Sequence, residues 1–195
     1  MLIQSVKAPV LITIFSLLSF LSFSQLTLPL GNSLQPIIEK VVKDYPNHFQ
    51  NIRAEEIYAD VQTTDFRSVV VIPGAEECVV TKYAAKNKAV YSWRANMLTT
   101  DDFNTAKKKF KTFYSQLNNL SVNLDGHAVI FRSNYQNPTE DKAFCSIIFS
   151  DDDYKELKIE LAMQYELVEW KIKILVYGKE RADNQRGDIT EGVNN

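Results

Sequence analysis

The chain has 195 residues, with 22 lysines and arginines against 24 aspartates and glutamates, which gives a formal net charge of −2. Apolar residues make up 45% of the chain and aromatic residues 11%, a composition typical of a globular protein and unlike that of a disordered, collagen-like or coiled-coil chain. Without an excess of basic residues we expect no nucleic-acid partner, because phosphate binding needs clustered lysine and arginine.

The first 24 residues have the pattern of a signal peptide. Lys7 is the only charged side chain before Glu39, and an apolar run containing serine and threonine spans residues 8–23. Small serines at positions 22 and 24 predict cleavage before Gln25. The apolar run is shorter than the roughly 20 residues that cross a bilayer. We therefore expect an exported protein, periplasmic or extracellular, with no membrane span after cleavage and with a linker over residues 25–33.

The next part of the chain predicts one helix and three strands. Residues 34–43 place Leu34, Ile37, Val41 and Val42 on one helical face, with Asn32 or Ser33 as the cap. Residues 48–65 keep no clean period and are interpreted as a loop with a short strand or helical turn. Strands are predicted over residues 66–72, 77–84 and 88–98, the last two as an antiparallel pair that turns at Lys86-Asn87.

Residues 99–120 predict the clearest helix, capped by Thr100. Apolar side chains recur at spacings of three and four and form one stripe, namely Phe103, Ala106, Phe110, Phe113, Leu117 and Leu120. Four lysines between positions 107 and 111 cover the opposite side, as a solvated face or, alternatively, as a surface for an acidic partner. A stripe of this size has to be buried against a sheet.

Four further strands are predicted over residues 127–135, 142–149, 154–163 and 168–176. In the last two, apolar and charged residues alternate strictly, so each strand has one apolar and one charged face. We expect Glu156 and Glu160 to pair across the strands with Lys171 and Lys173. Residues 178–195 have no apolar period and predict a disordered tail.

Together these elements predict one α+β domain over residues 34–177. Short connections between strands favour antiparallel pairing. The simplest arrangement that buries every apolar stripe has two layers: an antiparallel sheet of six or seven strands, with two helices packed on one face.

Reactive residues are few and scattered. Asp125 and His127 could form an acid–base pair of a hydrolase, with Ser133 farther along the same strand, but Asp125-Gly126 also fits a hairpin corner. No nucleophile motif such as GxSxG accompanies them. The acidic run at positions 151–153 lacks the spacing of a calcium loop, and the two cysteines and two histidines lack zinc spacing. We predict no metal and no cofactor.

The aromatic residues allow two interpretations. Five of them could line a cavity for a small apolar ligand between sheet and helix, or they could fill the core: Trp93, Phe103, Phe110, Phe113 and Tyr114. Cys78 and Cys145 likewise could form a disulfide after export or remain two separate buried thiols.

The pattern as a whole favours an exported, noncatalytic binding or accessory protein with an unknown partner. A carrier of a small apolar ligand is one alternative, and a hydrolase that uses His127 and Asp125 is another. A filled core with an exposed apolar patch or a bare sheet edge would favour protein binding.

Overall fold

The computed structural model describes residues 34–84, 89–124 and 126–178. The predicted signal peptide, the linker, the turn at Lys86-Asn87, Asp125 and residues 179–195 of the predicted tail lie outside these ranges. Within the described ranges, no helix is long and apolar enough to cross a membrane.

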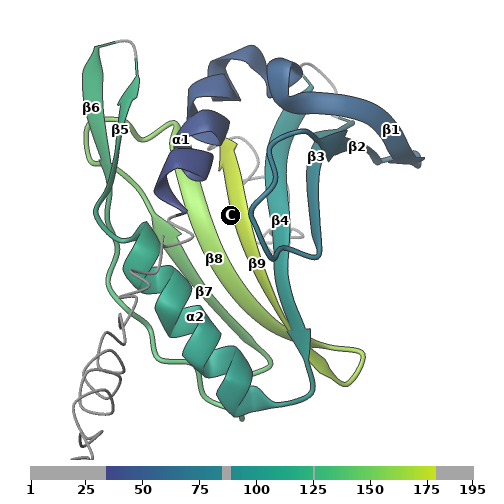
Figure 1. Ribbon diagram of the computed structural model, residues 1–195, viewed down its shortest axis with the longest axis vertical. Helices are drawn as coiled ribbons and strands as arrows, with labels where there is room; N and C mark the ends of the chain where they lie inside the picture. The colour runs from purple at the N-terminus through teal and green to yellow at the C-terminus, as the bar shows by residue number, and fades with distance from the viewer. Residues whose placement is uncertain (1–33, 85–88, 125, 179–195) are drawn as a thin grey trace, which may run out of the picture. The chain divides into compact units, whose positions relative to one another are not determined.

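The main element of the fold is a seven-stranded antiparallel sheet (Figure 1). Its strands, in the spatial order β1-β2-β3-β4-β9-β8-β7, are Arg53–Ala59, Thr63–Ser68, Glu77–Tyr83, Val90–Thr100, Glu169–Gly178, Leu157–Glu166 and Phe144–Phe149. A separate hairpin joins β5 (Leu120–Leu124) to β6 (His127–Phe131) around Gly126, whose φ is +86°. The predicted fold class, α+β with an antiparallel sheet, is confirmed.

Strands β8 and β9 show why the sheet has one apolar side. Alternate residues of both strands are fully or almost fully buried, namely Leu157, Ile159, Leu161, Met163, Trp170, Ile172, Ile174 and Val176. The register pairs Leu161 with Ile174, and Ile174 in turn pairs with Ala95 of β4. A shift of one residue would turn this whole set toward water, so burial fixes the register.

Helix α2 (Phe103–Leu117) packs on β4, β9 and β8. Asp102, not the predicted Thr100, caps it: its carboxylate accepts hydrogen bonds from the Asn104 N–H at 2.9 Å and the Thr105 hydroxyl at 2.6 Å. Asn119, at a φ of +66°, follows the helix, and Leu120 then begins β5. The predicted helical stripe is thus correct up to Leu117 and wrong at Leu120.

Helix α1 (Gln35–Asp44) packs against β5. Its last residue, Asp44, is buried, and its carboxylate accepts hydrogen bonds from the Asn51 and Ile52 N–H groups and from the Asn47 and Asn51 side-chain amides. These bonds hold the two 3₁₀ turns, Tyr45–Asn47 and Gln50–Ile52, that lead into β1. The residue at the N-cap is Leu34, which makes no side-chain cap. The position of α1 on the same face as α2 stays a prediction.

Two strands differ most from expectation. Residues 48–65 contain β1 and the start of β2, and β2 ends at Ser68, so residues 69–72 of the predicted strand are not strand. The Ser68 hydroxyl accepts the Val70 N–H and donates to the Val70 carbonyl, which turns the chain there. Strand β1 was hard to predict because two register shifts interrupt its pairing with β2, so its apolar residues do not alternate.

The substitution Phe110→Ala tests the docking of α2. Phe110 has no exposed surface, and removing a buried phenylalanine ring leaves a cavity that costs about 3–5 kcal/mol. The neighbouring Lys109 is exposed on the same helix, so Lys109→Ala is a matched control and should change the free energy of unfolding by less than about 0.5 kcal/mol. Urea unfolding measures both, and equal small effects would show that the stripe is not buried.

Candidate functional site

The aromatic residues predicted as ligand contacts form the interior of the protein. Trp93 and Phe110 have no exposed surface, and the Trp93 ring N–H donates to the Ser68 hydroxyl at 2.9 Å. Phe103, Phe113 and Tyr114 are partly buried and pack against the core. The burial of Trp93 and Phe110 favours the core interpretation for these two residues, whereas a ligand contact of the other three stays a prediction.

Only one member of the predicted acid–base pair lies within the described residues. His127 is exposed at the start of β6, opposite Leu124, whereas Asp125 lies outside the described residues. The Ser133 main chain is held by Asn118 and Tyr114: its N–H donates to the Asn118 amide oxygen, and its carbonyl accepts the Tyr114 hydroxyl. The pairing of His127 with Asp125 stays a prediction.

The disulfide that the sequence left open is not formed. Cys78 and Cys145 are both free, on β3 and β7. Three strands separate β3 from β7, which places them about 19 Å apart at the usual strand spacing, far beyond the roughly 4.4–6.8 Å between bridged Cα atoms. Burial raises the pKa of both thiols, so neither is an activated nucleophile.

In the acidic run at positions 151–153, Asp151 accepts hydrogen bonds from the main chain. The Asp151 carboxylate accepts hydrogen bonds from the N–H groups of Ile130 at 2.8 Å, Asp153 at 2.9 Å and Tyr154 at 3.0 Å. The Ile130 N–H is the largest of the causes that lower the pKa of Asp151. Among the described residues, no three metal-ligating side chains converge.

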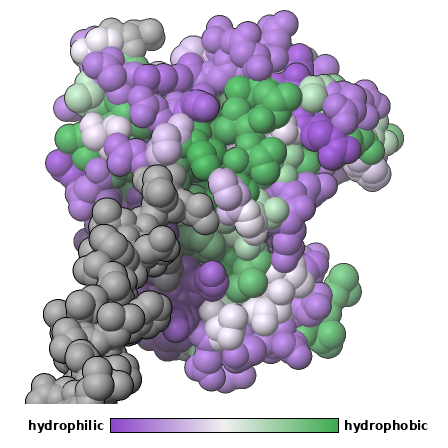
Figure 2. Space-filling model, viewed as in Figure 1, coloured by the Kyte–Doolittle hydropathy of each residue, from purple (hydrophilic) through white to green (hydrophobic). Residues whose placement is uncertain are grey.

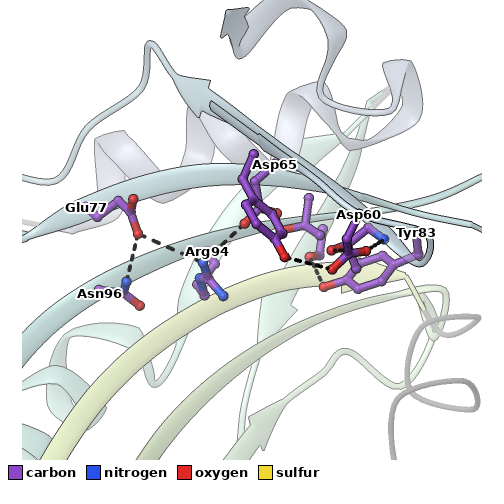
Figure 3. A network of polar contacts seen from close by, with 10 residues as sticks. Asp60, Asp65, Glu77, Tyr83, Arg94 and Asn96 are labelled. Atoms are coloured by element: carbon purple, nitrogen blue, oxygen red, sulfur yellow. Dashed lines mark hydrogen bonds and ion pairs between the residues drawn. The ribbon is translucent and has the colours of Figure 1, made fainter. Parts of the chain in front are cut away.

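The charged side of the sheet carries a polar network (Figure 3). The Arg94 guanidinium lies between Asp65, 3.8 Å away, and Glu77, 4.0 Å away, and Glu77 also accepts a hydrogen bond from Asn96. Arg94 Nε and Asn96 Oδ1 are buried without a hydrogen-bond partner. Because Arg94 has an acidic residue on two sides, we interpret it as a link between strands β2, β3 and β4.

The predicted pairing across β8 and β9 is corrected by the register. Lys171 and Lys173 contact Glu166, at 3.5 Å and 3.9 Å, instead of Glu156 or Glu160. Ala162 and Gln164 are the residues of β8 that pair with these lysines. The Glu160 carboxylate accepts the hydroxyls of Ser146 and Tyr177.

The turn between β8 and β9 has an unusual backbone. Glu166 pairs with Glu169, so the loop holds only Leu167 and Val168. Their φ angles are +51° and +65°. A two-residue loop with both φ angles positive is a type I′ turn, for which Asn-Gly and similar pairs are preferred. Each L-residue in this conformation costs about 1–2 kcal/mol, and a β-branched valine is an outlier there.

The same two residues are the centre of an exposed apolar surface. The side chains of Leu167 and Val168 are 80% and 76% exposed, and the exposed ring of Tyr165 lies next to them at the end of β8. We call these three residues the tip patch. Phe144 of β7 is also exposed, but it pairs with Gln164, so its side chain is on the opposite face of the sheet from Tyr165. Figure 2 shows a hydrophobic knob at the lower right, where Figure 1 places the β8–β9 turn.

Aromatic contacts link the tip patch to helix α2. The Tyr165 ring packs on Trp170 at 5.0 Å between centroids, and Trp170 packs on Phe103 of α2 at 5.1 Å. The Tyr165 N–H donates to the Ala143 carbonyl at 2.7 Å, which ties β8 to the residue before Phe144. Ring contacts through Trp170 therefore connect the tip patch to α2 and the core.

Sequence reasoning missed this site because the apolar alternation of β9 was extended back to Val168. A signal was present: the segment Glu166-Leu167-Val168-Glu169 joins two strongly alternating strands, yet it contains none of the glycine, asparagine, aspartate or proline residues usual in hairpin turns.

The chain matches no known family model, no curated protein and no solved structure. Its function therefore has to be argued from the geometry of its own residues.

The neighbours Asp151 and Asp152 provide a test of the acidic run. Asp151→Ala removes the acceptor of three N–H groups and should lower the free energy of unfolding by about 1–3 kcal/mol, whereas the exposed Asp152 should tolerate alanine. The pKa of Asp151 is lowered on folding, so its ionised form stabilises the fold above the unfolded pKa of about 3.9. This contribution is lost as the pH falls through the folded pKa.

Urea unfolding at pH 7 and at acid pH measures the effect. The difference between the wild type and Asp151→Ala should shrink at acid pH. Equal effects of the two substitutions, or a difference that grows on acidification, would contradict this role.

Proposed function

We propose that this chain is an exported, noncatalytic binding protein that engages a partner protein through the tip patch. The observation that carries the proposal is the Leu167-Val168 turn, in which a strained backbone holds two aliphatic side chains in solvent. Neither the strain nor the exposure stabilises the free protein. Backbone strain of this kind is concentrated at functional sites.

The chemistry of the tip patch favours a protein over other partners. It combines one aromatic ring with two aliphatic side chains, the type of group that fills a pocket at the centre of an interface. Glu166 and Glu169 flank the turn, and Lys171 and Lys173 contact Glu166. The charges beside the tip patch therefore roughly balance, and the matching surface is an apolar pocket.

The burial of two of the five aromatic residues supports a binding role over a carrier role. Trp93 and Phe110, two of the residues that would line an apolar cavity, are fully buried in the core. A ligand between α2 and the sheet would have to displace them.

The double substitution Leu167→Asn with Val168→Gly tests whether the turn is strained. Asparagine and glycine adopt positive φ readily, so the free energy of unfolding should rise by about 1–3 kcal/mol. Val61 is a matched control: it is 94% exposed in the β1–β2 turn and does not have a positive φ. Val61→Gly should not stabilise the protein. If the double variant is no more stable than the wild type, the strain is absent.

The same stabilised variant separates binding from folding. A photo-reactive amino acid at position 167 should give one discrete protein adduct in the cells that produce the chain, and the same group at the exposed position 109 of α2 should not. A photo-reactive group at position 165, the exposed ring of the tip patch, reports on binding without altering the turn. Its adduct should disappear in the double variant, although that variant is better folded.

Two results would contradict the proposal. Equal adducts from positions 109 and 167 would mean that the surface is contacted without preference. Binding of the purified wild type to neutral lipid vesicles, lost in the double variant, would identify the tip patch as a membrane anchor.

A further inference from the structure

A second cluster of functional groups lies where β1, β2 and β4 carry aromatic and basic side chains. The guanidinium carbon of Arg53, at the start of β1, is 4.7 Å from the centroid of the Phe66 ring and 5.5 Å from that of Tyr91. All three side chains are partly exposed. Two rings from two strands therefore fix the position of one cation.

The residue after the first 3₁₀ turn adds a third ring. His48 has a φ of +55°, and its imidazole stacks on Tyr91 with centroids 5.4 Å apart and planes 26° apart. Phe49, at a φ of +56°, places its ring wholly in the core. The strained pair thus anchors the backbone through Phe49 and leaves the His48 ring exposed against Tyr91.

Arg53 differs from other arginines of the sheet in its partners. Arg67 pairs with Glu55, and Arg94 lies between two carboxylates. Arg53 makes no ion pair with any residue that the structure describes. Glu56 is the acid opposite Phe66 on β1, and it is not paired with Arg53 either.

The neighbouring position carries a second cation. Lys82 of β3 is opposite Tyr91 and Thr64 in the sheet, is exposed, and likewise has no ion pair among the described residues. Thr64 and Lys82 also line a hollow of about 360 Å³, together with residues that include Asp60 and Tyr83, whereas Arg53 and the two rings do not line it.

We propose that Arg53, supported by Phe66 and Tyr91 and assisted by Lys82, binds an oxyanion, the carboxylate or phosphate group of a small ligand. A guanidinium stacked on aromatic rings keeps its planar fork of N–H donors free at the edge, and this fork matches two oxygens of one anionic group. The rings also reduce the side-chain freedom that binding would otherwise remove.

The site is tested by titrating the full chain with sodium acetate and with inorganic phosphate at constant ionic strength. The readout is the NMR signal of the Arg53 side-chain Nε–H, and that of Arg67 serves as an internal control. Binding predicts a saturable shift at Arg53 and a smaller, non-saturating shift at Arg67. A carboxylate ligand is indicated if acetate saturates the signal, and a phosphate ligand if only phosphate does.

Substitution of Arg53 tests whether binding depends on the paired N–H donors of the guanidinium or only on its positive charge. Arg53→Lys keeps the positive charge and should weaken binding about tenfold or more, because one ammonium cannot form the two parallel hydrogen bonds. Arg67→Lys should leave the affinity unchanged. The shift of the Lys82 side-chain ammonium follows binding in both variants.

The proposal is overturned if neither anion gives a saturable shift at Arg53, or if Arg53→Lys binds as well as the wild type. The titration of the unsubstituted protein decides the first point without any variant. Neither result depends on the tip patch, which lies on other strands.

Discussion

The burial of one side of β8 and β9 constrains the rest of the molecule. The eight alternating residues of that side contact α2 and the other core residues, and moving the register by one residue would expose all of them. With the register fixed, only Leu167 and Val168 remain to reverse the chain. The positive φ angles of these two residues are a consequence of that geometry.

The register of β8 and β9 explains why the turn has only two residues. It does not explain why these residues are leucine and valine. Asparagine and glycine would make the same turn without strain. The fold instead holds Leu167 and Val168 in solvent and supports them through Tyr165, Trp170 and Phe103. The free energy that this turn costs has to come from the interior, where α2 packs across β4, β9 and β8. A stable core and a strained exposed tip are therefore two parts of one arrangement.

The edge strand β1 is poorly suited to pairing with a strand of another protein, unlike the opposite edge β7, which pairs with β8 without a register shift. Two register shifts interrupt β1, and its pairing with β2 skips residues between Arg53 and Tyr58. Such irregularities discourage the addition of another strand to an open edge. Main-chain pairing with a partner is thus disfavoured at β1, whereas side-chain contacts at the tip patch meet no such obstacle.

The sequence predicts the parts of the fold in which local pattern and tertiary burial agree. The stripe of α2 and the alternation of β8 and β9 predict these elements correctly because their apolar residues are buried in the same core. The sequence does not predict strand β1 because its register shifts interrupt the alternation of apolar and polar residues. Leu120 has the spacing of a sixth residue of the helical stripe, but it begins β5 because Asn119, at positive φ, leaves the helix.

The candidate sites were less predictable than the fold. The tip patch depends on which residues a fixed register leaves in the turn, and Val168 continues the alternation of β9 in sequence although it points to solvent. The cluster at Arg53 depends on contacts between residues up to 43 positions apart, from His48 to Tyr91. Sequence spacing within one element carries no information about such contacts.

The most direct measurement is the backbone conformation of Leu167 and Val168 in solution. Isotope-edited NMR can record the intraresidue Hα–HN nuclear Overhauser effect at both residues together with a cross-strand contact between Glu166 and Glu169. A turn fixed by the register predicts strong intraresidue effects, which report positive φ, and a close Glu166–Glu169 pair. Weak effects at both residues, or strand pairing that leaves a longer loop, would show that the two side chains are not held out by the fold.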